Sequence, residues 1–212
     1  AELEQSSTKI TEDVSRGIVK LIVTRGFGGR GYAVTDQLEP EIFLIKTGYP
    51  DFQDNYWYEG VQIRTCNTRL SHQPALAGIK HMNRLEQVLA RNEWQDSNIS
   101  EGIMLDSHDN VIEGTMCNLF MVKDDKIYTP DLKLCGVAGV MRETVLTILG
   151  EETIPCEITC ISQAMLRSAD EVFLTNSVIG LWPVKKIDGT VYSIGSLSKT
   201  IQKNINNIIK NA

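Results

Sequence analysis

Short apolar runs recur along the whole chain, and most of them are too short for helices. Residues 17–25 (GIVKLIVTR) are rich in β-branched side chains and predict a strand. Similar runs predict further strands at residues 41–46, 61–66, 102–106, 111–113, 118–122, 125–129, 153–158, 171–175 and 181–187. Residues 25–32 contain four glycines in eight positions, which disfavours both helix and strand and predicts a loop.

Helical spacing of apolar residues appears in fewer places. Leu85, Val88 and Leu89 recur with this spacing and predict a helix over residues 83–92. Two more helices are expected over residues 162–168 and 194–209. Residues 1–9 (AELEQSSTK) also have a helical pattern, which suggests a segment already in progress rather than the start of a chain.

The segment after the glycine-spaced sequence GVAGVMR is predicted to form another helix, over residues 139–149. Gly150 is expected to end this helix, because glycine readily takes the conformation that follows a helix C-terminus. One side of the helix is predicted to carry Val140, Thr144, Val145 and Leu149. Strands and helices are therefore interspersed, which favours an α/β fold.

Size and charge narrow the possible functions. A chain of 212 residues can bury roughly 70–75% of the surface that its unfolded form exposes, so we expect a sizeable core. Its net charge of −6, from 21 basic and 27 acidic residues, argues against nucleic acid as a partner. The apolar runs fall short of the roughly 20 residues that span a bilayer, so we expect a soluble protein without a membrane partner.

The cysteines indicate neither structural zinc nor disulfide bonds. The chain has five of them and no C-x-x-C pair, and they are Cys66, Cys117, Cys135, Cys156 and Cys160. We therefore predict no metal site, and we interpret the cysteines as reduced core thiols of a cytoplasmic protein.

Lys80 is the first candidate for chemistry. It follows a turn of small residues (ALAGI) and precedes the predicted helix, so its amine could enter a cleft. A nucleophilic lysine needs a pKa below the usual value of about 10.4, through desolvation or a neighbouring cation. Arg84 could supply that cation if the helix has begun by Lys80. Both residues could equally be solvated surface charges.

A carboxyl group and a glycine-rich turn are the next candidates for chemistry. Glu113 ends a β-branched run, and if it faces inward it could keep a heterocyclic nitrogen protonated; a solvated strand end is the alternative. The free N–H groups of Val140 and Met141, after the glycine turn, could bind a phosphate group, or the segment could be a simple turn. Ser177, in the sequence TNS, could donate to the same anion or only end a strand. No Walker nucleotide motif is present.

Together these segments resemble the spaced signature of the class IV pyridoxal-phosphate enzymes, which include branched-chain and D-amino-acid aminotransferases and aminodeoxychorismate lyases. The matching positions are Glu113, Thr115, Asn118, Leu119, Phe120, Ile127, Thr129, Val137, Gly139, Val140 and Arg142. Residues 25–32 (RGFGGRGY), 76–91 (LAGIKHMNRLEQVLAR) and 139–144 (GVMRET) are most similar to the lyase branch. The resemblance extends over nearly all of the chain from Gly17 onward.

The resemblance implies a fold type IV α/β enzyme. Its small N-terminal α/β domain would be incomplete here and occupy residues 1–58, and a larger domain of short strands and packed helices, 59–212, would bind the cofactor. Family members begin with early strands and a phosphate-clamping arginine, so we expect the chain to begin inside a longer protein. The polar and aromatic segment 49–60 would connect the two domains.

The resemblance also implies roles for individual residues. Lys80 would hold pyridoxal 5′-phosphate covalently, and Glu113 would pair with its ring nitrogen. The phosphate would be bound by Val140, Met141 and Ser177, while Asn118 would have a structural role near the turn and Arg84 would be the neighbouring cation. Arg30, and second Arg25, are candidates for binding substrate carboxylates; a mobile basic surface loop is the alternative.

The activity implied is that of a carbon–oxygen lyase that converts 4-amino-4-deoxychorismate into 4-aminobenzoate and pyruvate, for folate biosynthesis. One alternative is an aminotransferase acting on branched-chain or D-amino acids, because Lys80 and Glu113 would serve it unchanged. A second is a truncated module that binds without catalysis. Family members pair as homodimers, and the resemblance implies the same here.

Overall fold

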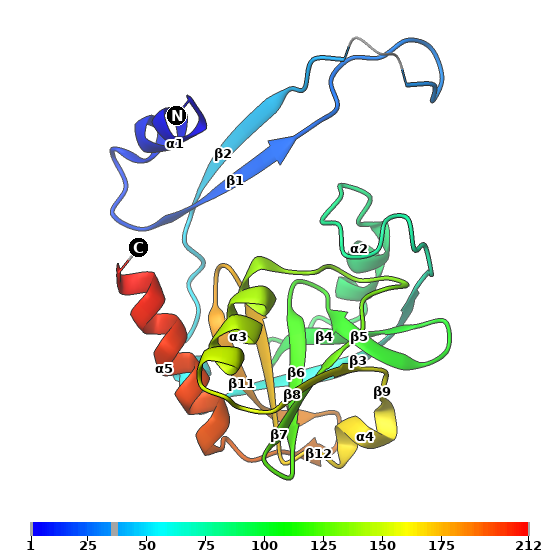
Figure 1. Ribbon diagram of the computed structural model, residues 1–212, viewed down its shortest axis with the longest axis vertical. Coiled ribbons are helices and arrows are strands. Elements are labelled where there is room, and N and C mark those ends of the chain that lie inside the picture. The colour runs from blue at the N-terminus through cyan, green and yellow to red at the C-terminus, as the bar shows by residue number, and fades with distance from the viewer. Residues whose placement is uncertain (1, 35–37, 212) are drawn as a thin grey trace. The chain divides into compact units, whose positions relative to one another are not determined.

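The computed structural model describes residues 2–34 and 38–211, which form two compact units (Figure 1). The first unit ends at Phe52 and the second begins at Gln53. The short 3-10 helix η1 (Asp54–Trp57) therefore belongs to the second unit, a few residues before the boundary expected from the sequence. The reason is its packing, because the Trp57 indole N–H donates to the Ile179 carbonyl over 2.8 Å.

The first unit has a helix and a two-stranded antiparallel sheet. Its elements are α1 (Glu2–Thr11), β1 (Gly17–Val23) and β2 (Ile42–Gly48). The register pairs Gly17 with Gly48 and Val23 with Ile42, which confirms both predicted strands. The described part of the glycine-rich segment after β1 is irregular, as predicted. Gly26 is needed there, because its φ is +88° and a Cβ would collide with the Glu39 carbonyl.

The second unit is built around a ten-stranded sheet. Its strands are β3 (Val61–Leu70), β4 (Ile99–Asp106), β5 (Asn110–Gly114), β6 (Asn118–Lys123), β7 (Lys126–Pro130), β8 (Cys156–Thr159), β9 (Ile161–Ser162), β10 (Glu171–Asn176), β11 (Gly180–Ile187) and β12 (Thr190–Val191). The order is β8-β7-β6-β10-β11-β3-β4-β5-β9, with β12 on β11. A further pairing of β5 with β6 closes β6, β10, β11, β3, β4 and β5 into a ring.

The helices of this unit confirm the predicted ones and bury two apolar clusters. They are α2 (Leu85–Arg91), α3 (Val140–Glu151), α4 (Gln163–Arg167) and α5 (Ser196–Asn211). In Figure 1, α3 and α5 lie side by side against the sheet. Their cluster includes Phe120 and Phe173, whose rings stack 5.0 Å apart. A second cluster, containing Trp94 and Met104, lies between α2 and strands β3 to β5.

Helix α3 differs from the prediction at both ends. Val140, predicted on the same side as Val145 and Leu149, is 76% exposed, whereas the buried positions of this helix are Arg142, Val145, Ile148 and Leu149. The helix also continues past Gly150 to Glu151. Thr153 takes the left-handed conformation instead, with φ of +55°, and the Ile154 N–H closes the turn on the Leu149 carbonyl over 2.9 Å.

Helix α2 is present, but its apolar residues do not face the core. Leu85, Val88 and Leu89 are all exposed, and Ala90 is the fully buried residue of this helix. Of the cysteines, Cys66, Cys117 and Cys135 are buried, Cys156 is half-buried and Cys160 is exposed, and all five are free thiols. No helix within residues 2–34 and 38–211 has the length and apolar character needed to cross a membrane.

Candidate active site

Glu113 lies where the ring of strands closes. It is the next-to-last residue of β5, and it pairs with Asn118, the first residue of β6, across the short β5–β6 turn. Its side chain is 4% exposed, and its Oε2 accepts a hydrogen bond of 2.8 Å from the Val137 N–H. The carboxyl group therefore faces the interior of the unit and not solvent.

The electrostatic surroundings of Glu113 bring the predicted residues together. Burial raises the pKa of Glu113 to about 7. The Val137 N–H and the positive charges of Arg84 and Lys80 act in the opposite direction, as does a hydrogen bond with Gln87. Lys80 and Arg84 are therefore close enough to Glu113 to influence its protonation.

The backbone before Lys80 is fixed to the segment that holds Glu113. The Gly78 N–H donates to the Gly136 carbonyl over 2.9 Å, and the Ala138 N–H donates to the Gly78 carbonyl over 3.0 Å. Gly78 has φ of +78°, a conformation that favours glycine. The Lys80 side chain is exposed, so its amine is accessible to a ligand.

Arg84 acts differently from the sequence expectation. Helix α2 begins only at Leu85, so Arg84 is not one helical turn beyond Lys80. Its guanidinium group turns back to the loop: Nε donates to the His81 carbonyl and Nη2 to the Ile79 carbonyl, each over 2.9 Å. Arg84 therefore fixes the backbone on both sides of Lys80.

Asn118 orders the glycine-rich turn. Its Nδ2 donates to the Val137 carbonyl over 2.7 Å, and its Oδ1 accepts from the Gly139 N–H over 3.1 Å. A Cβ on Gly139 would collide with that oxygen, which explains the glycine. Helix α3 then starts at Val140, and the N–H groups of its first turn, including Met141, have no partner within the helix.

Ser177 lies in an exposed turn after β10. The strand register brings this end of β10 to the site, because Thr175 pairs with Asn118. Thr175 is fully buried, and its hydroxyl has no hydrogen-bond partner among the residues that the structure describes. Asn176 shapes the turn, since its Oδ1 accepts from the N–H groups of Val178 and Ile179.

The two substrate-binding candidates, Arg25 and Arg30, belong to the first unit. Both are exposed in the irregular segment after β1. Their role in binding carboxylates stays a prediction.

Some residues near the site were not expected. Glu101 of β4 is 1% exposed, and its oxygens accept from the N–H groups of Thr115 and Met116 in the β5–β6 turn. A cavity of about 140 Å³ also borders the loop around Lys80. Its lining includes His81, Arg84, Gln87, Cys135 and Gly136. Glu101 lies just before the predicted strand 102–106, so the sequence carried no signal for it, whereas Gln87 lies within the predicted helix 83–92, three positions after Arg84.

Comparisons with known proteins agree with this arrangement. The aminodeoxychorismate lyase of Vibrio harveyi is 39% identical to the chain over 208 residues, covering 96% of this chain and 76% of the relative. The crystal structure of 4-amino-4-deoxychorismate lyase from Pseudomonas aeruginosa superposes with a TM-score of 0.92 at 44% identity. That match covers 97% of this chain and 76% of the other.

The fold is that of the fold type IV pyridoxal-phosphate enzymes. The branched-chain amino acid aminotransferase of T.th., solved with pyridoxamine 5′-phosphate, shares it with a TM-score of 0.82 at 20% identity, covering 98% of this chain and 70% of that one. The family model for class IV aminotransferases matches residues 2–187. The chain therefore belongs to the class IV aminotransferase family, whose cofactor is pyridoxal 5′-phosphate.

Proposed function

We propose that this protein is a pyridoxal-phosphate-dependent lyase that converts 4-amino-4-deoxychorismate into 4-aminobenzoate and pyruvate, a step of folate biosynthesis. The observation that carries the proposal is the buried Glu113 carboxyl group, next to the charges of Lys80 and Arg84 and held by the glycine-rich turn before α3. The similarity to two lyases, at 39% and 44% identity, supports this activity over transamination.

The side chains present fit the cofactor. A buried carboxylate is costly unless a cation lies beside it, and burial has raised the pKa of Glu113 to about 7. A protonated pyridine nitrogen would supply that cation. The fully buried Thr175 hydroxyl, which lacks a partner in the described part of the chain, is a polar group that a bound ligand could satisfy.

Each residue would have a separate task. Lys80 would hold the cofactor covalently, and Glu113 would keep its ring nitrogen protonated. The first-turn N–H groups at Val140 and Met141, with the Ser177 hydroxyl, would bind the phosphate. When bound, the cofactor supplies an electron sink for the charge that develops on the substrate. Asn118 would act through the backbone, by holding the turn in place.

Lys80 is also the candidate base. In the overall reaction the substrate ring loses the hydrogen on its amine-bearing carbon, and the bond to the enolpyruvyl oxygen breaks. The ring becomes aromatic and pyruvate leaves. Once the substrate amine has taken its place on the cofactor, the free Lys80 Nζ would take that ring proton and return a proton to the departing enolpyruvyl group, which becomes pyruvate. Its loop is fixed on both sides by Arg84 and its side chain is accessible.

The substrate carries two carboxylates, which are best matched by arginine. Arg30 is the first candidate and Arg25 the second, since both lie in a glycine-rich segment that leaves their side chains exposed. An Arg30→Gln variant is expected to raise KM more than it lowers kcat. An unchanged KM in Arg30→Gln and in Arg25→Gln would remove these residues from the site.

We further propose that the protein is a cytoplasmic homodimer. The apolar side of α2, formed by Leu85, Val88 and Leu89, is exposed in the single chain, as is the preceding Met82. An apolar stripe at helical spacing is expected to be covered by another surface. The free thiols suit a reducing compartment. Analytical ultracentrifugation of Leu89→Glu against the parent protein would test the dimer.

Borohydride reduction with peptide mapping tests the cofactor assignment. The cofactor mass is expected on the peptide with Lys80, absent in Lys80→Ala, and retained in Lys123→Ala, a control whose lysine pairs with Asp170 on the surface. Formation of 4-aminobenzoate and pyruvate then tests the lyase. Conversion of the cofactor to its pyridoxamine form by branched-chain or D-amino acids, with little pyruvate formed from 4-amino-4-deoxychorismate, would favour an aminotransferase. Absence of the cofactor mass from every lysine-containing peptide would indicate a module that binds without catalysis.

A further inference from the structure

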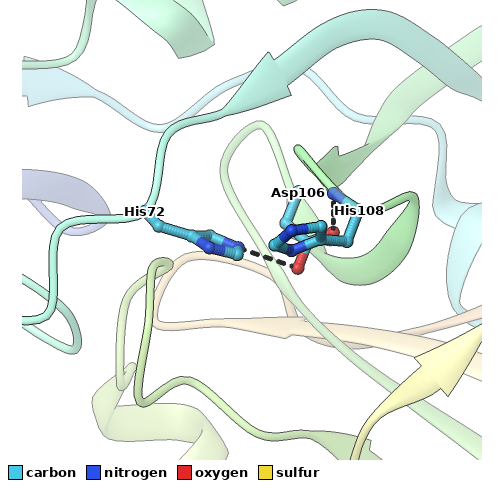
Figure 2. Close-up of side chains that lie close together, drawn as sticks. All are labelled: His72, Asp106 and His108. Carbon is cyan, nitrogen blue, oxygen red and sulfur yellow. Dashed lines mark hydrogen bonds and ion pairs between the residues drawn. The ribbon is translucent and has the colours of Figure 1, made fainter.

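A second group of polar side chains lies outside the site described above. His72 follows β3, Asp106 is the last residue of β4, and His108 lies in the β4–β5 turn. Figure 2 shows the two imidazole rings next to each other, beside the Asp106 carboxylate. His72 Nε2 is 3.0 Å from Asp106 Oδ2, and the ring centroids are 4.9 Å apart. One possible ligand atom from each residue lies within 4.8 Å of the others.

The carboxylate at the centre of this group is fixed before any ligand arrives. Asp106 Oδ1 accepts from the N–H groups of His108 and Asn110, over 2.9 and 2.8 Å, and Asn110 Nδ2 donates to Oδ2 over 3.0 Å. His72 Nε2 lies on the same oxygen as Asn110 Nδ2, so the chain itself fixes the position of both carboxylate oxygens.

The charges around the group also suit a cation. Arg69, the nearest basic side chain in the sequence, is engaged by Asp109 over 2.9 Å. Glu86 accepts from the Ser71 N–H next to His72 over 3.0 Å. A bound divalent ion would therefore meet one fixed carboxylate and two imidazoles, in surroundings that include further acidic groups.

We propose that His72, Asp106 and His108 bind a divalent transition-metal ion of the zinc type through two imidazole nitrogens and one carboxylate oxygen. Ligand atoms around tetrahedral zinc lie about 3.4 Å apart. The three possible ligand atoms lie within 4.8 Å of one another, so the widest separation must close by up to about 1.4 Å. His108 can move in this way, because it is exposed and lies in the β4–β5 turn. The fourth position would be open to water.

Such an ion would join two segments that lead to the active site. His72 lies on the stretch between β3 and Lys80, which is attached by the Gln73 N–H to the Leu134 carbonyl over 2.8 Å. Asp106 and His108 lie directly before β5, the strand that carries Glu113. The metal would therefore stabilise the backbone segments that carry Lys80 and Glu113, without contacting the substrate.

The test is metal binding by the whole chain after treatment with a chelator, with Co²⁺ followed by its visible absorption and Zn²⁺ by competition with a chromogenic chelator. One equivalent is expected to bind, with the intense absorption of tetrahedral cobalt. His72→Ala and His108→Ala should each weaken binding at least tenfold. His81→Ala, which changes the third histidine of the chain, should bind like the parent.

A stability control and one further variant keep the result decisive. His108 is exposed, so His108→Ala should unfold at the parent's temperature in the presence of chelator, and a binding loss there does not reflect misfolding. Cys160 lies 2.9 Å from Asn110 Oδ1, so Cys160→Ser tests a thiolate ligand and should leave binding unchanged. Absence of stoichiometric binding, or full binding by His108→Ala, would overturn the proposal.

Discussion

Glu101 and Glu113 are buried carboxyl groups on the paired strands β4 and β5, yet their surroundings differ. Glu101 accepts hydrogen bonds from the Gly102 N–H over 2.7 Å, the Thr115 N–H over 3.1 Å and the Met116 N–H over 3.1 Å, and from the Thr115 hydroxyl. Burial raises the pKa of Glu101 against these donors. Glu113 accepts one backbone hydrogen bond, from Val137, and faces the charges of Lys80 and Arg84.

The difference separates a carboxyl group that holds a turn from one that can serve a ligand. The donors around Glu101 belong to the chain itself and fix the β5–β6 turn, so this group has its partners in the folded protein. Glu113 has a pKa raised to about 7 and lies near positive charges. Such a group can give up its proton when a cation binds beside it. Burial alone therefore does not identify a functional acid.

The largest expected effect comes from Glu113→Gln. The variant keeps the shape of the side chain and an oxygen for the Val137 N–H, but it loses the negative charge beside the cofactor ring. Loss of one such preorganised interaction lowers kcat by roughly 10²–10³-fold. Single-turnover formation of 4-aminobenzoate would measure it. A variant within threefold of the parent would mean that Glu113 does not face the ring nitrogen.

Glu101→Ala should act on folding instead. It would leave the N–H groups of Thr115 and Met116 without their acceptor and open a space in a packed region, which together cost roughly 4 kcal/mol of unfolding free energy. Urea denaturation at pH 7 would measure this loss. Glu113→Gln in the same experiment should lose no stability, and equal losses in both variants would remove the distinction between the two carboxyl groups.

The pH dependence of stability should distinguish Glu113 further. Its pKa rises from 4.5 in the unfolded chain to about 7 in the folded one, so the unfolded state deprotonates first. Its contribution to stability is thus fully present below pH 4.5 and is lost as the pH rises to about 7, with a ceiling of about 3 kcal/mol.

In the cofactor-free protein, the free energy of unfolding of the parent should fall relative to that of Glu113→Gln as the pH rises. Denaturation from pH 5 to pH 8 would measure this difference. Cofactor binding should flatten the difference, because a cation beside Glu113 favours its charged form. A parallel pH profile for the two cofactor-free proteins would contradict the assigned protonation behaviour.

Short-range patterns in the sequence were enough for most elements and for part of the site. The strands, the glycine-rich loop and helix α5 follow from residue types that act locally, and Glu113 could be recognised by its place in a spaced signature. Glu101 could not, because its partners Thr115 and Met116 are distant in the sequence and meet it only when β4 pairs with β5. Long-range pairing carries no local signal.

The sequence predictions that were wrong failed because the local pattern did not contain the tertiary contact that decided the outcome. Gly150 looked like a helix end, but the helix continues to Glu151, and Thr153 takes the left-handed conformation that closes the turn. Leu85 and its apolar neighbours predicted the helix correctly, but their spacing cannot tell whether a core or another surface covers them. The spacing of Lys80 and Arg84 suggested a helical pair, whereas Arg84 donates to the loop backbone at Ile79 and His81.

Arg84→Lys should give the smallest of these effects. Lysine keeps the positive charge near Glu113 but cannot donate to the Ile79 and His81 carbonyls at once, so the Lys80 loop loses about 1 kcal/mol of hydrogen bonding. Cofactor affinity should fall by up to about tenfold, while the pH profile stays in place because the charge remains. Arg91→Lys, at the last residue of α2, is the matched control, because Arg91 contacts the Trp94 ring and carbonyl instead. Equal losses of cofactor affinity in the two variants would show that Arg84 stabilises α2 generally and does not position Lys80.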